Sequence, residues 1–82
     1  MAKKSGWEIA ATNILKSELT KKGINYEGMS VALSKIGVEM RPENINKNIN
    51  LGKFTFKFFL QCAKAIGIKN LRLDELLVED NE

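Results

Sequence analysis

The sequence contains no histidine, a single cysteine and no apolar run long enough to cross a membrane. Histidine is the usual general base at neutral pH and the commonest metal ligand, so its absence argues against catalysis and against a zinc site. The carboxylates also lack the spacing that calcium-binding loops require. We therefore expect neither an enzyme nor a protein that holds a metal or another cofactor.

The single cysteine, Cys62, cannot form an internal disulfide. It lies on the apolar face of a predicted helix, where a cysteine behaves as a small buried hydrophobic residue. At the N-terminus, the segment M-A-K-K-S-G carries lysines that no apolar stretch follows, so no signal peptide is expected. These features predict a cytoplasmic protein.

Positive charge dominates most of the chain, although the formal net charge is only +3. Residues 1–71 carry 12 basic and 5 acidic side chains, whereas residues 72–82 carry 1 basic and 5 acidic side chains. Such a basic body favours an anionic partner, and nucleic acid is the usual one for a small domain. The alternative is a solvated surface with an acidic tail that aids solubility.

The 82 residues suit one small all-α domain, because helices with short connections bury enough surface in a short chain. Apolar residues at helical spacing, capping residues and glycines predict a compact bundle of about five short helices. These helices are expected at residues 7–22, 26–36, 42–51, 56–66 and 71–78. Residues 1–6 would form a flexible basic arm, residues 7–78 the domain and residues 79–82 an acidic tail.

The stretch from Gly52 to Gly67 contains all four phenylalanines and is expected to form the centre of the core. Its predicted inward face consists of Phe54, Phe56, Phe59, Cys62, Ala63 and Ile66. The first three helices are expected to add Trp7, Ala10, Ala11, Ile14, Leu15, Leu19, Tyr26, Met29, Leu33, Ile36, Ile45 and Ile49. Gly28 weakens the second helix, and it indicates either a close backbone approach or a position of no special function.

The predicted helix at residues 42–51 has an unusual outer surface. Ile45 and Ile49 face the core, while the outer arc consists of Glu43, Asn44, Asn46, Lys47, Asn48 and Asn50. Each asparagine costs a helix roughly 0.5–0.7 kcal/mol relative to alanine, so a surface selected only for stability rarely collects several of them. A functional surface is one explanation, and a polar face in contact with solvent is the other.

Several motifs together resemble the lambda-repressor-like (Cro and Xre type) helix-turn-helix domains. The central stretch K-F-T-F-K-F-F-L-Q-C-A-K-A-I-G follows a polar helix and precedes L-D-E-L-L. The motifs N-K-N-I-N-L-G-K-F and F-F-L-Q-C-x-x-A-I-G are also similar to those of a bacterial domain family described as of unknown function. The span from Met29 to Ile45 is longer than the compact repressor pattern, which predicts an extended turn before the third helix.

The resemblance implies that the third helix enters the major groove of double-stranded DNA. Asn44, Lys47 and Asn48 would then contact base edges, because asparagine can bond to adenine and lysine can donate to guanine. Phosphate contacts would come from Asn25, Tyr26, Arg41 and Lys53.

The expected function is therefore sequence-specific binding of double-stranded DNA by a small bacterial or phage-type transcriptional regulator. A homodimer through Leu73, Leu76 and Leu77 would supply a second half-site, although these leucines could instead close the core. The alternative is a protein-protein interaction module on a helix-turn-helix scaffold that does not bind DNA. RNA binding is less favoured, because the aromatic rings that would stack on bases are expected to be buried.

Overall fold

Four helices follow one another in the part of the chain that the computed structural model describes, residues 5–71 and 73. They are α1 (Gly6–Lys22), α2 (Tyr26–Lys35), α3 (Pro42–Leu51) and α4 (Phe56–Ile66). No strand occurs among these residues, and the expected all-α class is confirmed. The helix predicted at residues 71–78 and the tail predicted at residues 79–82 lie outside the described residues, apart from Leu71 and Leu73.

Capping side chains set where the helices begin. α1 begins one residue before the predicted position, because Ser5 and Glu8 form a capping box in which each side chain accepts from the other residue's backbone N–H. Asn25 caps α2 by accepting from the Gly28 N–H at 2.7 Å, and Thr55 caps α4 in the same way. A Cβ at Gly28 would lie 3.3 Å from the Asn25 side-chain oxygen, so this glycine makes room for the cap and not for another backbone.

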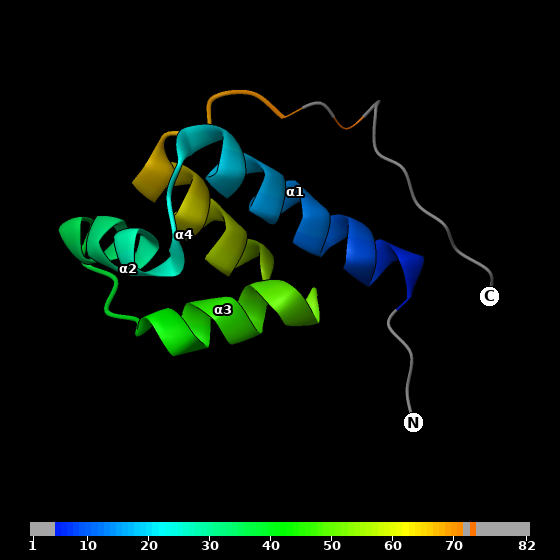
Figure 1. Cartoon of the computed structure of the whole chain (residues 1–82), viewed down its shortest axis with the longest axis horizontal. Coiled ribbons are helices and arrows are strands. Elements are labelled where there is room, and N and C mark those ends of the chain that lie inside the picture. Colours follow the sequence, from blue (N-terminus) through cyan, green and yellow to red (C-terminus); the bar gives the residue numbers. More distant parts are fainter. Residues whose placement is uncertain (1–4, 72, 74–82) are drawn as a thin grey trace.

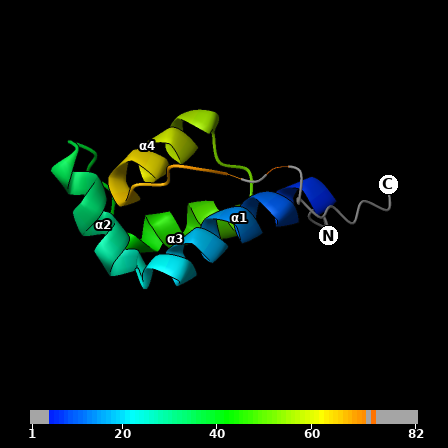
Figure 2. The same cartoon turned by 90° about the horizontal axis from the view of Figure 1, so that it is seen from above.

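The core consists of one pair of buried residues from each helix, with the two members four positions apart. The pairs are Leu15 and Leu19, Met29 and Leu33, Ile45 and Ile49, and Phe58 and Cys62. Residues at this spacing share one helix face. α2 packs against both α3 and α4, and α1 packs against α3 (Figure 1, Figure 2). None of the helices in residues 5–71 combines the length and the apolar character that a membrane-spanning segment requires.

The inward face predicted for α4 is wrong in part. Phe58 is buried, whereas Phe56, which was expected in the core, is 72% exposed. Two residues that are two positions apart differ by about 200° around a helix axis, so they cannot both face the core. The ring centroids of Phe54 and Phe58 lie 5.7 Å apart, and those of Phe56 and the half-buried Phe59 lie 6.2 Å apart. The phenylalanines therefore form two ring pairs, one of which includes the exposed Phe56, rather than one buried cluster.

Two further residues that were expected in the core lie at the surface. Trp7 is 61% exposed, and Ile36, which follows the end of α2 at Lys35, is 38% exposed. Ile36 no longer shares the inward face because its backbone has left the helical conformation. Trp7 and Phe56 are both accessible, so buried aromatic rings cannot be used as an argument against RNA binding.

The first turns of α1 hold the end of α3 from behind. The Thr12 hydroxyl donates a buried hydrogen bond to the Ile49 carbonyl oxygen at 2.6 Å. Gly52 ends α3 with a φ of +69°, and a Cβ at this position would overlap the Glu8 carbonyl group. The Glu8 carboxylate also lies 3.8 Å from the Lys53 ammonium. The position of α3 is therefore fixed by direct contact between two backbones.

The connection between α2 and α3, residues 36–41, is long but anchored. The Ser30 hydroxyl donates to the Met40 carbonyl oxygen at 2.6 Å, and the Val38 N–H donates to the Leu33 carbonyl oxygen at 2.9 Å. The side chains of Val38 and Met40 pack against the core. This segment therefore has a defined path beside α3.

Cys62 is fully buried, in agreement with its predicted role as a small hydrophobic residue. Removal from water disfavours the thiolate, and burial raises the pKa of the Cys62 thiol from its ordinary 9.0 to about 12. Since the thiolate is the nucleophilic form, the folded protein keeps this sulfur unreactive.

The Gly52→Ala variant should lose about 2–5 kcal/mol of unfolding free energy. A methyl group at this position must displace the Glu8 backbone and also adopt a left-handed conformation, and both effects are unfavourable. Gly23→Ala is the matched control, because Gly23 ends α1 with a φ of +65° and no described atom lies within 4 Å of its Cβ position. The control should lose only about 1–2 kcal/mol. If urea denaturation gives the same loss of unfolding free energy for both variants, α1 and α3 are not in close contact at Gly52.

A thiol reagent at about pH 8 should label Cys62 slowly in the folded domain and rapidly in urea, because only the unfolded chain offers a thiolate. The thiol ionises near pH 9.0 when unfolded and near 12 when folded. The stabilising effect of the buried neutral thiol is thus complete below pH 9.0 and is lost as the pH rises toward 12. Rapid labelling without denaturant would contradict the buried position.

Candidate nucleic-acid interface

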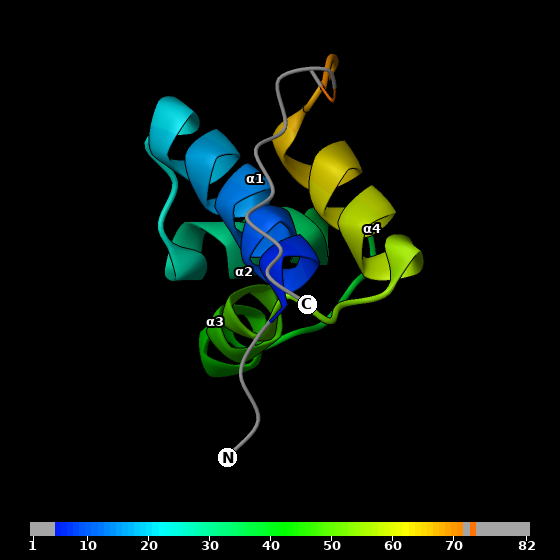
Figure 3. The ribbon, with the colours of Figure 1, turned by 90° about the vertical axis from the view of Figure 1, so that its right-hand side faces the viewer.

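The outer side of α3 is not covered by another described helix (Figure 1, Figure 3). α1, α2 and α4 all lie on its inner side, where Ile45 and Ile49 are completely buried. The exposed side chains of the helix include Glu43, Asn44, Asn46 and Lys47. α3 therefore presents charged and amide groups outward while its apolar face is held by the core.

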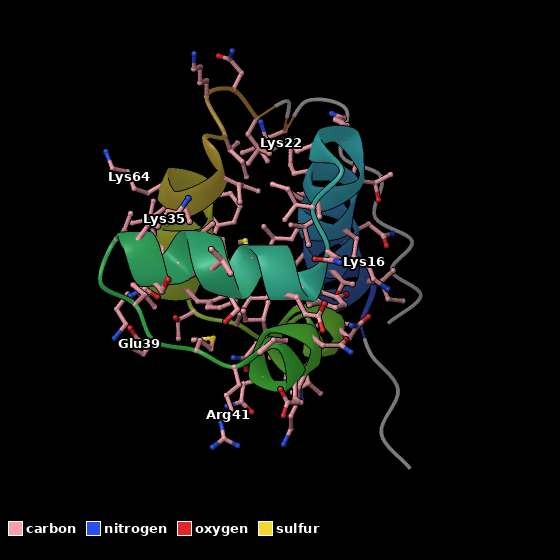
Figure 4. The ribbon with its side chains drawn as sticks, turned by 60° about the vertical axis from the view of Figure 1, so that its left-hand side comes forward. Lys16, Lys22, Lys35, Glu39, Arg41 and Lys64 are labelled. Atoms are coloured by element: carbon pink, nitrogen blue, oxygen red, sulfur yellow. The ribbon has the colours of Figure 1, made fainter. Side chains whose placement is uncertain are left out.

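The three predicted base contacts lie around one hollow beside α3, which we call the α3 hollow. Asn44, Lys47 and Asn48 line it from the helix, and Arg41 and Glu39 line it from the preceding connection. Figure 4 shows the Arg41 side chain pointing away from the body of the protein at the edge of α3. A guanidinium, an ammonium and two amides thus surround one open space, and all of these groups can donate to phosphates or base edges.

The asparagines of α3 differ in how strongly they are held. Asn50 donates to the Tyr26 hydroxyl at 3.3 Å and to the Asn46 backbone carbonyl at 2.8 Å. Asn48 is half-buried, whereas Asn44 is exposed and its side chain has no hydrogen bond to the described residues. Asn50 therefore contributes to the packing of α3 on α2, and Asn44 is the amide that is most available to a ligand.

A second hollow, which we call the α4 hollow, continues from the α3 hollow toward the start of α4. Met40 and Asn48 line both hollows. Lys53, Lys57 and Gln61 also line the α4 hollow. The two hollows therefore lie next to each other on the α4 side of α3, and the Asn48 and Met40 side chains that they share contact each other, with Asn48 Nδ2 3.9 Å from Met40 Sδ. We call the two adjoining hollows the groove.

Lys57 was not predicted from the sequence as a site residue. The inward face predicted for α4 was wrong. A helix with Phe56 in the core, instead of Phe58, would point Lys57 away from α3. Once Phe58 is recognised as the buried ring, Lys57 and Gln61, four positions apart, share the side that faces the groove. Lys53, which was predicted, also reaches the groove, although its ammonium lies 3.8 Å from the Glu8 carboxylate.

Asn25 and Tyr26, two predicted phosphate contacts, lie on the opposite flank of α3. They line a different hollow together with Glu27 and Glu43. The Asn25 side-chain oxygen caps α2, and the Tyr26 hydroxyl accepts from Asn50. The structure thus separates these two residues from the other predicted site residues and places them between Glu27 and Glu43 on one side and Lys16, which lines a neighbouring hollow with both, on the other.

The predicted dimer contact through the C-terminal leucines falls within the described residues only at Leu73. Leu73 is 59% exposed, and Leu76 and Leu77 lie outside the described residues. Among residues 5–71 and 73, no three Cys, Asp or Glu side chains are grouped in a way that could hold a metal ion.

Comparison with known proteins gives one result. Residues 7–71 match the model of a family described as a domain of unknown function (DUF6471). No curated protein matches the chain, and neither does any solved structure. The family match agrees with the predicted similarity to a domain family of unknown function, and it names no helix-turn-helix. Because it covers α1 to α4 and most of the sequence, the chain belongs to the DUF6471 domain family.

Proposed function

We propose that this domain binds double-stranded DNA in a sequence-specific manner and acts as a small bacterial or phage-type transcriptional regulator. The observation that supports this function most strongly is the α3 hollow, where Asn44, Lys47 and Asn48 meet Arg41 on the open side of one helix. The basic character of residues 1–71 supports the same kind of partner, because DNA attracts basic proteins over long distances.

In this proposal α3 lies in the major groove, which is wide enough to admit one α-helix. Asn44 and Lys47 are three positions apart and project from the same side of the helix. The Asn44 amide can bond bidentately to adenine, and the Lys47 ammonium can donate to guanine or to a phosphate. Asn48 lies deeper in the hollow, where its amide would meet a base edge only after α3 has entered the groove.

The contacts behind α3 support a reading role. Discrimination between bases needs side chains that are held within a fraction of an ångström, so the helix that carries them must be rigid. The Thr12 hydrogen bond to Ile49 and the close packing of Gly52 on Glu8 provide this rigidity at the end of α3. The Ser30 hydrogen bond to Met40 does the same before its start.

The arrangement of α2, the connection at residues 36–41 and α3 would form a lambda-repressor-like helix-turn-helix with an extended turn. One such unit reads few base pairs, so useful specificity normally requires two copies on a palindromic site. The exposed Leu73 would contribute to that dimer.

A protein-protein interaction module is the second candidate. Phe56 and Leu60 lie four positions apart on α4 and are 72% and 52% exposed. Large exposed apolar side chains at one place are typical of protein contacts. In this case the domain would keep the helical scaffold without binding DNA.

Titration of the domain with random duplex DNA at several salt concentrations distinguishes these candidates. The proposed function predicts binding at low salt. The affinity should fall steeply as salt rises, because DNA releases its bound counterions when the protein binds and added salt opposes this release. Selection from a random duplex pool should then recover a preferred sequence. Stronger binding to single-stranded DNA or RNA of equal length would oppose the proposal, and no binding to any of them would favour the protein partner.

The Lys47→Ala and Asn44→Ala variants should each weaken binding to the selected duplex by about 1–3 kcal/mol. Neither variant should lose more than about 0.5 kcal/mol of unfolding free energy, because both side chains are exposed and Asn44→Ala replaces a poor helix former with a good one. Lys35→Ala is the control, since Figure 4 shows Lys35 on α2 away from Arg41 and α3. If both α3 variants bind as tightly as the control, α3 is not the reading helix.

A further inference from the structure

The two flanks of α3 carry opposite charge. The groove on the α4 side is lined by four basic residues, Arg41, Lys47, Lys53 and Lys57. The hollow on the α2 side is lined by Glu27 and Glu43, and none of the residues that line it is basic. A helix with one cationic and one anionic flank cannot bind phosphates equally well on both sides.

The basic side chains of the groove are largely uncompensated. Among the residues that line the groove, one, Glu39, carries a carboxylate, against four basic residues. Of the four basic groups, Lys53 lies near a carboxylate, Glu8, at 3.8 Å, while Arg41, Lys47 and Lys57 form no ion pair within the described residues. Their charge is therefore available to an anion from solution.

The groove has an apolar interior and a cationic rim. Val38, Met40 and Phe58 line it between the basic residues. A nucleic-acid strand alternates a charged phosphate with a sugar whose carbon atoms are less polar, so it can place phosphates at such a rim and a sugar above such a floor. The four basic residues are spread from the residue before α3 to the first turn of α4, which suits several phosphates better than a single anion.

We propose that one DNA strand runs along the α4 flank of α3, with its phosphates held by Arg41, Lys53 and Lys57, and that the start of α2 contacts no phosphate. This inference rests on the proposed function and extends it, because it assigns the backbone contacts to one flank and adds Lys57 to them. On the other flank, Glu27 and Glu43 repel phosphate and outnumber Lys16, which lines the next hollow with Asn25 and Tyr26. The Asn25 side-chain oxygen also occupies the Gly28 N–H, one of the donors that a phosphate at this helix start would use.

The test compares Lys57→Ala with Lys64→Ala in the full chain, using the selected duplex and a scrambled duplex. Both lysines are exposed on α4, but Lys64 lies on the side of α2 away from α3 (Figure 4). Lys57→Ala should weaken binding to both duplexes by a similar factor and reduce the slope of log affinity against log salt by about 1. Lys64→Ala should leave affinity and slope unchanged.

A third variant, Glu27→Gln, tests the opposite flank. It should change affinity less than about twofold, because the inference places no phosphate beside α2 and salt weakens interactions between charges that are not in contact. A large gain in affinity would place phosphate beside α2 and overturn the inference, as would equal behaviour of Lys57→Ala and Lys64→Ala. If the α3 variants lose specificity while Lys57→Ala has no effect, only this inference fails. If the parent domain binds no duplex at low salt, the proposed function fails with it.

Discussion

The contact between Gly52 and the Glu8 backbone is the constraint on which the rest of the structure depends. It brings the end of α3 against the start of α1 at a distance that no residue with a Cβ permits. The Thr12 hydroxyl then donates a buried hydrogen bond to the Ile49 carbonyl oxygen in the last turn of α3. Because α2 packs on the other part of α3, the helix is held along its whole inner side and leaves one surface to solvent.

That surface differs from its surroundings in chemistry as well as in exposure. Asn44 and Lys47 are exposed beside Arg41, whereas Asn50 is tied to Tyr26 and supports the packing on α2. Amides in one helix thus serve two separate purposes, since some join α3 to the scaffold and others remain available. This division is what a helix that must be both fixed and accessible requires, and it is consistent with contact to a partner through α3.

Much of the fold could be predicted because its signals are local. Asn25, Thr55 and Gly52 mark helix ends through their own backbone and side-chain chemistry, and Ile45 and Ile49 mark a face by spacing alone. The face of α4 could not be found in this way, since phenylalanines occupy almost every position around its start and give no clear period. The roles of the asparagines depended on partners far away in the sequence, and no spacing rule reveals those.

The unequal flanks of α3 also affect how the molecule moves before any contact forms. Positive charge on one edge of a helix and negative charge on the other produce a transverse electric dipole on the scale of a few side chains. In the field of a polyanion such a dipole experiences a torque, which turns the basic edge toward the anion during the approach. Fewer collisions then occur in unproductive orientations, so the charge arrangement would accelerate association as well as strengthen the final complex.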